Sequence, residues 1–237
     1  DFQRPLSLKT SYSQGHILVE VAADQLMAFT RTLKEPIQTI APFTCARSVL
    51  ETSALAIWLL DNNITPLERV NRSFAFRYEG MEQQRKLINS SNSENNNGKV
   101  KKKTEKIVET ARKLGLKIFT DKKEKVTGIG VRMPSITRLT KDILDKEFDY
   151  RFLSSVTHGH HFALAQTSFA KYGDSEDEDI SLFEKSLSPV LILYLCNLTS
   201  EVFIRAVRNL TQLHGTFNKE YQILFADTQK KLDKYYQ

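Results

Sequence analysis

The sequence feature that most constrains the fold is a nearly continuous apolar stretch from Phe43 to Leu60. Its apolar side chains recur at three- and four-residue intervals, at Phe43, Ala46, Val49, Leu50, Ala54, Ile57, Trp58 and Leu60. This spacing is typical of a helix, and a helix with so few polar positions is stable in water only when other elements surround it. We therefore predict a central helix around which the rest of the chain packs.

Helices are also predicted on both sides of this segment. Residues His16 to Leu33 place their apolar side chains along one stripe, as in an amphipathic helix. Thr65 to Glu68 has the composition of a helix start, because Thr caps free backbone N–H groups, Pro suits the first helical position and Glu follows three residues after the cap. The helix that starts there is predicted to run from Pro66 to about Ile88 and to form an antiparallel hairpin with the central helix.

The second half of the chain continues the helical pattern. Further helices are predicted at Val100–Leu114, Ser135–Leu144, Asp149–Tyr172, Ile180–Leu213, with a bend at Pro189, and Asn218–Tyr236. Residues 116–131 show apolar alternation and contain two nearby glycines, which fits either a small β-hairpin or an extended insertion. The sequence as a whole predicts an all-α fold, an irregular helical bundle of about seven helices.

Length and composition favour one domain. The chain has 237 residues and 41% of them are apolar, which is enough for a sizeable core without disulfide bonds. We therefore predict a single helical domain over residues 1–237. Within it, residues 90–98 read SSNSENNNG and favour a mobile surface loop, and residues 99–134 are predicted to form a basic insertion.

Cysteine usage indicates a reducing compartment. The two cysteines, Cys45 and Cys196, both fall within apolar helical patterns, where a free thiol usually behaves as a small buried apolar group. No basic segment followed by an apolar one opens the sequence, and the apolar run Leu187–Leu198 is interrupted by Ser, Pro and Asn. We therefore expect a cytoplasmic protein without a membrane partner.

Charge is unevenly distributed along the chain. The net charge is +6, from 34 Lys and Arg against 28 Asp and Glu. Basic residues concentrate between Val100 and Lys125, and residues 174–179 are almost entirely acidic. The basic segment is either an ordinary solvated helix face or a surface that attracts a phosphate backbone. In the second interpretation the candidate nucleic-acid contacts are Lys101, Lys102, Lys103 and Lys106.

Several nucleotide-binding and hydrolase motifs are missing from the sequence. It contains no phosphate-binding loop, no dinucleotide-binding glycine motif, no Gly-x-Ser-x-Gly and no His-Glu-x-x-His. This argues against the motif-bearing forms of NTPases, dehydrogenases, esterases and zinc proteases. No cofactor is predicted.

One segment, Asp149–His161, contains residues suited to chemistry on phosphates. Arg151 and His158 are seven residues apart, or two helical turns, so a helix would place both on one face. A guanidinium binds a phosphate through two N–H groups, and an imidazole titrates near neutrality and can move a proton to or from a ribose hydroxyl. Arg151 and His158 are therefore the candidate catalytic residues for metal-independent RNA cleavage.

The histidines of this segment are also compatible with a structural or a metal-binding role. His158 could end a helix with its ring bonded to a backbone carbonyl. Together with His160 and His161 it also suggests a zinc or nickel site. A regular helix would not let the three rings converge on one ion, and no Cys or carboxylate lies nearby in the sequence, so no metal site is predicted.

Two charged residues occur on the otherwise apolar central helix. Arg47 and Glu51 are four residues apart, and a buried charge is costly unless it is paired. They either form a structural ion pair or face Arg151 and His158 across a polar pocket, with Glu51 orienting an imidazole or a guanidinium. In the second interpretation Arg47 and Glu51 support the chemistry.

The spacing Arg151-x6-His158 on a helical bundle resembles the Arg-x4-6-His motif of HEPN-domain proteins, many of which are RNases of bacterial defence and toxin systems. The resemblance implies that Arg151 holds the scissile phosphate, that His158 is the general acid/base, and that the protein acts on RNA as a homodimer. Supporting roles then fall to Arg47, Glu51, Tyr150 and His161. The chain is also similar to an uncharacterised group of bacterial helical proteins, over the segments Arg47–Ala54, Trp58–Asp61, Glu68–Val70 and Tyr150–Gly159.

A competing interpretation belongs to another class of function. In it the chain is a non-catalytic helical module for protein interaction or small-ligand binding. The same four residues, Arg47, Glu51, Arg151 and His158, would then make a polar core whose hydrogen bonds are satisfied internally.

Overall fold

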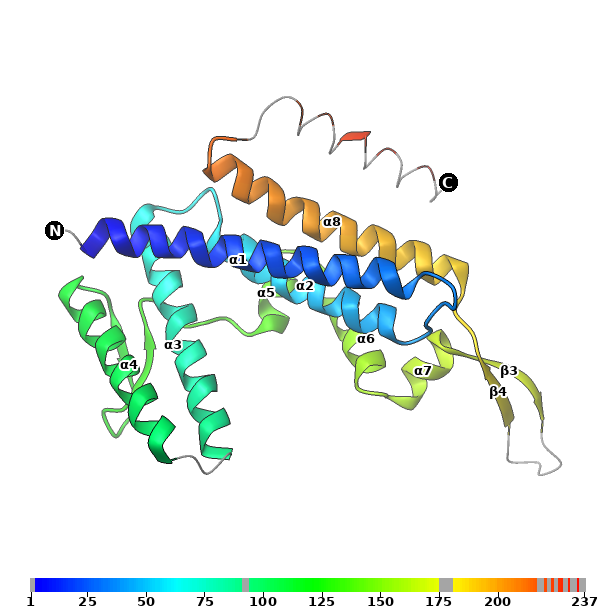
Figure 1. Cartoon of the computed structure of the whole chain (residues 1–237), viewed down its shortest axis with the longest axis horizontal. Helices are drawn as coiled ribbons and strands as arrows, with labels where there is room; N and C mark the ends of the chain where they lie inside the picture. The colour runs from blue at the N-terminus through cyan, green and yellow to red at the C-terminus, as the bar shows by residue number, and fades with distance from the viewer. Residues whose placement is uncertain are drawn as a thin grey trace. The chain divides into compact units, whose positions relative to one another are not determined.

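The structure is a computed structural model that describes residues 3–90, 94–174 and 181–216, with isolated positions between 220 and 234. Eight helices and two antiparallel two-stranded sheets make up this described part of the chain (Figure 1). The predicted all-α fold, an irregular helical bundle, is therefore confirmed, and of the two alternatives predicted for residues 116–131 the structure has the small β-hairpin.

Contacts divide the chain into two compact units. The first comprises Asp1–Gly15 and Leu59–Ser135, and the second comprises His16–Trp58 and Ile136–Gln237. Each unit is thus assembled from two segments that are far apart in the sequence. The single domain predicted over residues 1–237 stays a prediction.

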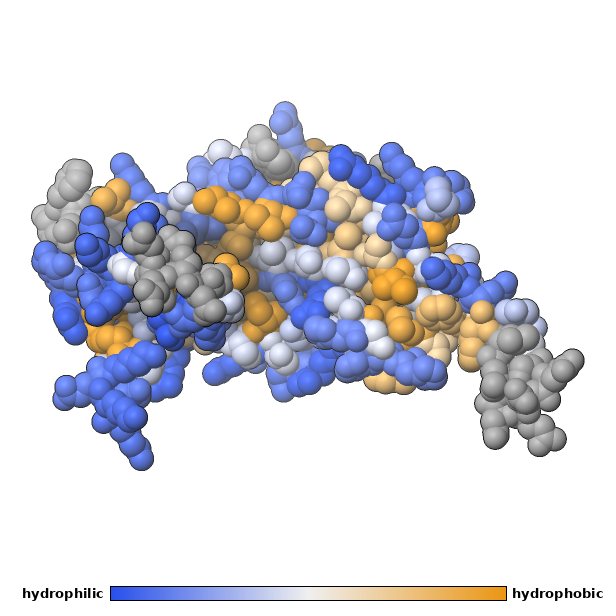
Figure 2. Space-filling view, turned by 60° about the horizontal axis from the view of Figure 1, so that its bottom comes forward, coloured by the Kyte–Doolittle hydropathy of each residue, from blue (hydrophilic) through white to orange (hydrophobic). Residues whose placement is uncertain are grey.

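Apolar side chains reach the surface in both units. Leu67 and Leu87 are more than half exposed in the first unit, and Phe148, Phe162 and Val190 are more than half exposed in the second. Figure 2 shows hydrophobic residues gathered in separate patches among hydrophilic ones on one face of the molecule. Scattered exposure of this kind is normal, so only an exposed group beside reactive side chains points to a function.

Helix α1 (Gln3–Thr32) begins well before the predicted start at His16. In its first part Ser7 and Ser11 are buried although their side chains are polar. The Ser11 hydroxyl donates to the Leu8 carbonyl, 2.6 Å away, and this internal bond offsets the cost of burying it. The buried face of this part of α1 therefore contains serines, which a search for an apolar stripe does not detect.

Helix α2 (Ala41–Leu59) matches the predicted central helix. Most of the apolar side chains that define it are fully buried, at Phe43, Ala46, Val49, Leu50, Ala54 and Leu59. Its C-terminal end is held by Arg69, which is only 2% exposed. The Arg69 guanidinium donates to the carbonyls of Leu59 and Asp61, both at 2.6 Å, so it satisfies acceptors that a helix end leaves free.

The other elements of the first unit are two helices and a hairpin. Helix α3 (Pro66–Ser90) starts as predicted, and the Glu68 N–H donates to the Thr65 hydroxyl at 3.1 Å. Helix α4 (Glu94–Lys113) begins inside residues 90–98, for which a mobile loop was predicted; residues 91–93 lie outside the described part. Strands β1 (Ile118–Thr120) and β2 (Val126–Ile129) form the hairpin that follows.

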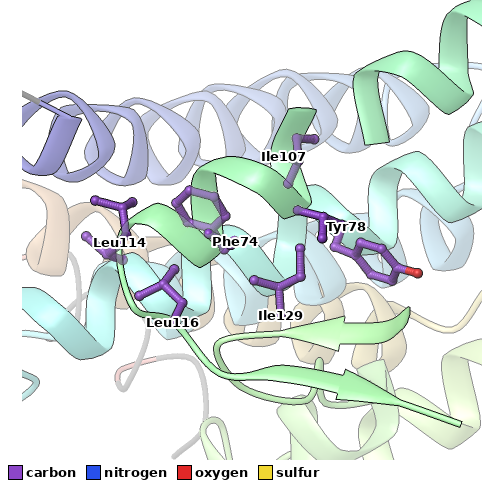
Figure 3. Close-up of a cluster of buried hydrophobic side chains, with 9 residues drawn as sticks. Phe74, Tyr78, Ile107, Leu114, Leu116 and Ile129 are labelled. Atoms are coloured by element: carbon purple, nitrogen blue, oxygen red, sulfur yellow. The ribbon is translucent and has the colours of Figure 1, made fainter. Parts of the chain in front are cut away.

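The first unit has its own apolar core, made by α3, α4 and the hairpin (Figure 3). The buried members are Val70, Phe74, Tyr78, Ile107, Val108, Ala111, Leu114, Leu116 and Ile129. The Tyr78 hydroxyl lies 2.5 Å from the Val126 carbonyl, which joins α3 to the hairpin. Gly130 has φ of 71°, and a Cβ there would lie 2.6 Å from the Asn71 carbonyl oxygen, so the hairpin can approach α3 only because this residue is glycine. The basic insertion predicted at residues 99–134 is thus an integral part of the first unit.

In the second unit the predicted helix Asp149–Tyr172 is wrong. Helix α5 (Ile136–Asp142) leads into α6 (Glu147–Thr157), and α6 is followed by a short α7 (His161–Thr167) and by strand β3 (Phe169–Asp174). The physical reason for the interruption is Gly159, whose φ of 71° is left-handed and ends the helix. Apolar residues lie on both sides of this polar turn, at Leu153, Val156, Phe162 and Ala163, and the prediction joined them into one helix.

The predicted helix Ile180–Leu213 is also too long at its N-terminal end. Strand β4 (Ser181–Lys185) pairs with β3, and helix α8 (Pro189–Leu213) begins only at the proline. Pro189 does not bend a helix but occupies its first position, where its missing N–H costs nothing. Most of the final helix predicted at Asn218–Tyr236 lies outside the described residues.

Polar contacts tie α5 and α6 to α8. The Arg205 guanidinium donates to the carbonyls of Ile143 and Leu144, at 2.7 and 3.2 Å, and Lys146 pairs with Glu201 at 3.0 Å. The Tyr194 hydroxyl donates to the Asp149 carboxylate. These contacts hold the N-terminal half of α6, and the turn before it, against α8.

The two cysteines of the second unit, Cys45 and Cys196, are free and partly buried. Burial raises the pKa of both thiols, which disfavours the reactive thiolate.

Helix α8 is long and apolar enough to cross a membrane, judged by length and composition alone. A core helix of a globular protein passes the same test. Two of its three charged residues, Glu201 and Arg205, have partners within the second unit that the contacts above describe. The expectation of a cytoplasmic protein without a membrane partner stays a prediction.

Candidate functional site

The candidate site lies where the C-terminal end of α6 meets α2. The two helices are in contact through Phe43 and Phe152, whose rings meet edge to face with centroids 6.2 Å apart. At the end of α6 the His158 N–H donates to the Ser154 carbonyl, 2.9 Å away, and Gly159 then turns the chain. This local geometry presents the His158 ring to the side chains of α2.

Four side chains meet at this point: Arg47 and Glu51 from α2, Tyr150 from α6 and His158 at its end. We call them the Arg47 cluster. Arg47 Nε donates to Glu51 Oε1 at 2.8 Å, and Arg47 Nη1 lies 3.2 Å from His158 Nε2. The Arg47 guanidinium carbon is 5.7 Å from the centre of the Tyr150 ring. Arg47 thus holds three different partners at once.

The hydrogen bond between Arg47 and His158 sets the role of one imidazole nitrogen. A guanidinium can only donate hydrogen bonds, so His158 Nε2 must be the acceptor. The lone pair of Nε2 is thereby engaged with Arg47. Once the guanidinium releases it, this nitrogen can accept a proton from a hydroxyl.

The cluster is at the surface and not inside the core. The side chains of Arg47 and Glu51 are 20% and 28% exposed, and His158 is exposed. A molecule in solution can therefore reach the imidazole. The two α2 residues form an ion pair, and Arg47 contacts His158, one of the two residues that the functional interpretation placed opposite the pair.

Arg151 is placed differently from the expectation that it shares a site with His158. Its side chain is 66% exposed, and both of its hydrogen bonds go to Glu147 Oε1, at 3.0 and 2.9 Å. The Arg151 guanidinium, together with Lys141, holds the pKa of the Glu147 carboxyl below its usual range. Within the part of the chain that the structure describes, no hydrogen bond or ion pair joins Arg151 to the Arg47 cluster. The reason is the i,i+4 spacing, which favours pairing with Glu147 one turn earlier.

The neighbouring histidines extend the site away from α2. The His160 ring lies 6.3 Å from that of His158 and 6.1 Å from that of Phe162, measured between centroids. His161 starts α7 and is exposed. Among the described residues, no group of three or more His, Cys, Asp or Glu side chains is placed to hold a metal ion.

Exposed aromatic rings flank the site, and they were not predicted from the sequence. Phe148 is 77% exposed and stacks on Phe152 with the ring planes 4° apart, while Phe162 is 58% exposed. The sequence feature that could have predicted the stacked pair is the spacing of Phe148 and Phe152, which are four residues apart and therefore neighbours on α6.

The four predicted nucleic-acid contacts, Lys101, Lys102, Lys103 and Lys106, all lie on α4 in the first unit and are exposed. They do not form one surface. Lys103 and Lys106 line a hollow together with Arg77, whereas Lys101 lines another hollow together with Glu82 and Glu105. The first hollow is therefore the more basic of the two.

Comparisons with known protein families, with curated proteins and with solved structures found no match for this chain.

Proposed function

We propose that the chain is a HEPN-like, metal-independent ribonuclease or RNA-binding protein that acts at the Arg47 cluster. The observation that carries this proposal is the 3.2 Å contact between Arg47 Nη1 and His158 Nε2 at the surface. A cation and a potential base are thereby held together with no metal required. Glu51 and the Tyr150 ring set the orientation of the guanidinium.

In the proposed reaction a phosphate of RNA displaces His158 as the partner of Arg47. The 2′-hydroxyl oxygen then attacks the phosphorus while His158 Nε2 takes the hydroxyl proton. The P–O5′ bond breaks, and the 5′-oxygen takes a proton from water. His158 later releases its proton, which neutralises the hydroxide that this water became. The products are a 2′,3′-cyclic phosphate and a 5′-hydroxyl. Arg47 stabilises the charge that builds up on the phosphate oxygens.

Single-stranded RNA is the favoured substrate class because of the rings beside the cluster. Proteins that bind single strands stack unpaired bases on exposed aromatic side chains. His160 and Phe162 follow His158 in a series of adjacent rings, and Phe162 is largely exposed. In this proposal Arg151 gives up Glu147 to hold a neighbouring phosphate, a role that its exposed guanidinium allows.

The experiment is a cleavage assay on a single-stranded RNA oligonucleotide in the presence of EDTA. Wild-type protein is expected to cleave, and His158→Ala is expected to lower the rate by about 100-fold or more, the usual contribution of a general base. His16→Ala is the matched control, since His16 is also exposed, lies in the same unit and pairs with a carboxylate four residues away. Equal rates for the two variants would contradict the proposal.

A second candidate function is the non-catalytic helical module, for protein interaction or small-ligand binding. The observation in its favour is the partial burial of the Arg47–Glu51 pair, which joins α2 to the end of α6 as a structural contact would. It predicts that His158→Ala lowers the melting temperature while no cleavage is seen with the wild type.

A further inference from the structure

The first unit contains a basic hollow that the proposed ribonuclease site does not use. It lies between α3 and α4 and has a volume of about 530 Å³. Three cations line it: Arg77 from α3, and Lys103 and Lys106 from α4. Among the described residues, no carboxylate lines this hollow, whereas the two smaller hollows beside it contain Glu82 and Glu105.

Arg77 differs from Arg72 and Arg85, the other arginines on the solvent-accessible part of α3. Arg72 pairs with Glu68 and Asp61, and Arg85 pairs with Glu82. Arg77 is partly buried, its guanidinium carbon lies 5.1 Å from the centre of the Phe74 ring, and no carboxylate among the described residues pairs with it. Burial lowers its pKa. A partly buried cation without an anion is costly, so a bound anion would stabilise the fold.

The two lysines complete an anion site. Lys103 and Lys106 are three residues apart, so they project from one face of α4. Neither forms an ion pair with a described residue, whereas Lys113 further along α4 pairs with Glu109 at 2.6 Å. Phe76 and Met81 line the same hollow and supply an apolar wall beside the charges.

We propose that this hollow binds the phosphate group of a nucleotide-sized ligand, with the ligand's ring against Phe76 and Met81. Its volume is in the range of small-molecule sites, and three cations match the charge of a phosphorylated compound. The phosphate comes either from a free nucleotide or from the backbone of an RNA strand. Because the hollow lies in the first unit, the proposal stands or falls independently of the Arg47 cluster.

The test is isothermal titration calorimetry of the whole chain with ADP, with adenosine, and with a single-stranded RNA oligonucleotide. We expect ADP to bind with a stoichiometry of one and adenosine to bind far more weakly, because it lacks the phosphates. If RNA binds and ADP does not, the phosphate source is the strand, provided that the variants below abolish RNA binding. Binding of neither ADP nor RNA would overturn the proposal.

Two variants locate the binding. Gly80 lines the hollow, and a Cβ there would meet nothing within 4 Å, so Gly80→Leu is expected to fill the hollow without lowering the melting temperature. Lys103→Gln combined with Lys106→Gln removes two of the three charges, and Lys99→Gln, at an exposed lysine of the same helix that does not line the hollow, is the control. We expect the Kd to rise at least about tenfold in the first two variants and less than about twofold in the control. An unchanged Kd in both Gly80→Leu and the double variant would contradict the proposed location.

Discussion

Arg47 and Glu51 are four residues apart on α2, and their pairing follows from this spacing as much as from any function. What distinguishes the pair is its third partner, the His158 ring, which comes from 111 residues later in the sequence. The chemistry of the cluster therefore depends on a single cross-helix contact. Arg69 is the structural counterpart in the first unit, since its guanidinium bonds two backbone carbonyls and its side chain is buried away from any ligand in solution.

Replacing Glu51 by Gln separates the two interpretations of the cluster. Because the pair is partly solvated, the free energy of unfolding should fall by at most about 1 kcal/mol. The rate of RNA cleavage should fall by more than this small loss of stability can explain. KM should rise as well, because Arg47 loses the carboxylate that orients it. Chemical denaturation and initial rates measure the two effects. Asp142→Asn, which removes the partner of exposed Arg138, is the control. A large loss of stability with no change in KM would favour the structural interpretation.

Tyr78 gives the first unit a specific response to alkaline pH. Burial raises the pKa of Tyr78 to about 12, from an ordinary value of 10.0. The folded state therefore favours the neutral form of Tyr78. The contribution of this neutral phenol to the free energy of unfolding is fully present below pH 10 and is lost as the pH rises towards 12.

The variant Tyr78→Phe isolates this effect from other alkaline titrations. Below pH 10 it should be less stable than the wild type by about 1 kcal/mol, because the hydrogen bond to the Val126 carbonyl is lost. Between pH 10 and pH 12 the difference should shrink, since only the wild type has a phenol to ionise. Unfolding free energies measured at several pH values check this. A difference that stays constant up to pH 12 would contradict the assigned burial.

At the scale of elements, periodicity predicted the helices that bury an apolar stripe, and local motifs predicted their starts. Helices α2 and α3 and the β1–β2 hairpin are where the sequence placed them. The sequence prediction failed at Gly159, where a polar turn separates two segments that had been joined into one helix, and at Glu94, where a short polar segment is helical. The β3–β4 hairpin was missed because its strands lie in segments that had been assigned to long helices.

The turn at Gly159 positions His158, and its conformation can be tested. A Cβ at Gly159 would meet nothing within 4 Å, but φ of 71° is unfavourable for any residue with a side chain. Gly159→Ala should therefore lower the free energy of unfolding by about 1 kcal/mol. Gly80→Ala is the opposite control, because Gly80 is helical and equally open, and alanine there should stabilise α3 by about 0.5–1 kcal/mol. Two changes of the same sign would contradict this description of the turn.

At the scale of the whole molecule, the candidate chemistry divides between the two units. The Arg47 cluster belongs to the second unit and the basic hollow to the first. The sequence indicated the residues of the cluster, because Arg47, Glu51, Tyr150 and His158 were all singled out. It assigned the phosphate to Arg151, and only the tertiary contact identified Arg47 as the guanidinium beside His158. The homodimer implied by the resemblance to HEPN-domain proteins stays a prediction.

The most direct test of the central claim compares two oligonucleotides of the same sequence, one RNA and one with 2′-deoxyribose at every position, both incubated with the wild-type protein and EDTA. The proposed mechanism predicts that only the RNA is cleaved, that the new ends are a 2′,3′-cyclic phosphate and a 5′-hydroxyl, and that Arg47→Ala and His158→Ala each lower the rate by about 100-fold or more. Cleavage of the deoxy strand, or an intact RNA after prolonged incubation with folded protein, would contradict it.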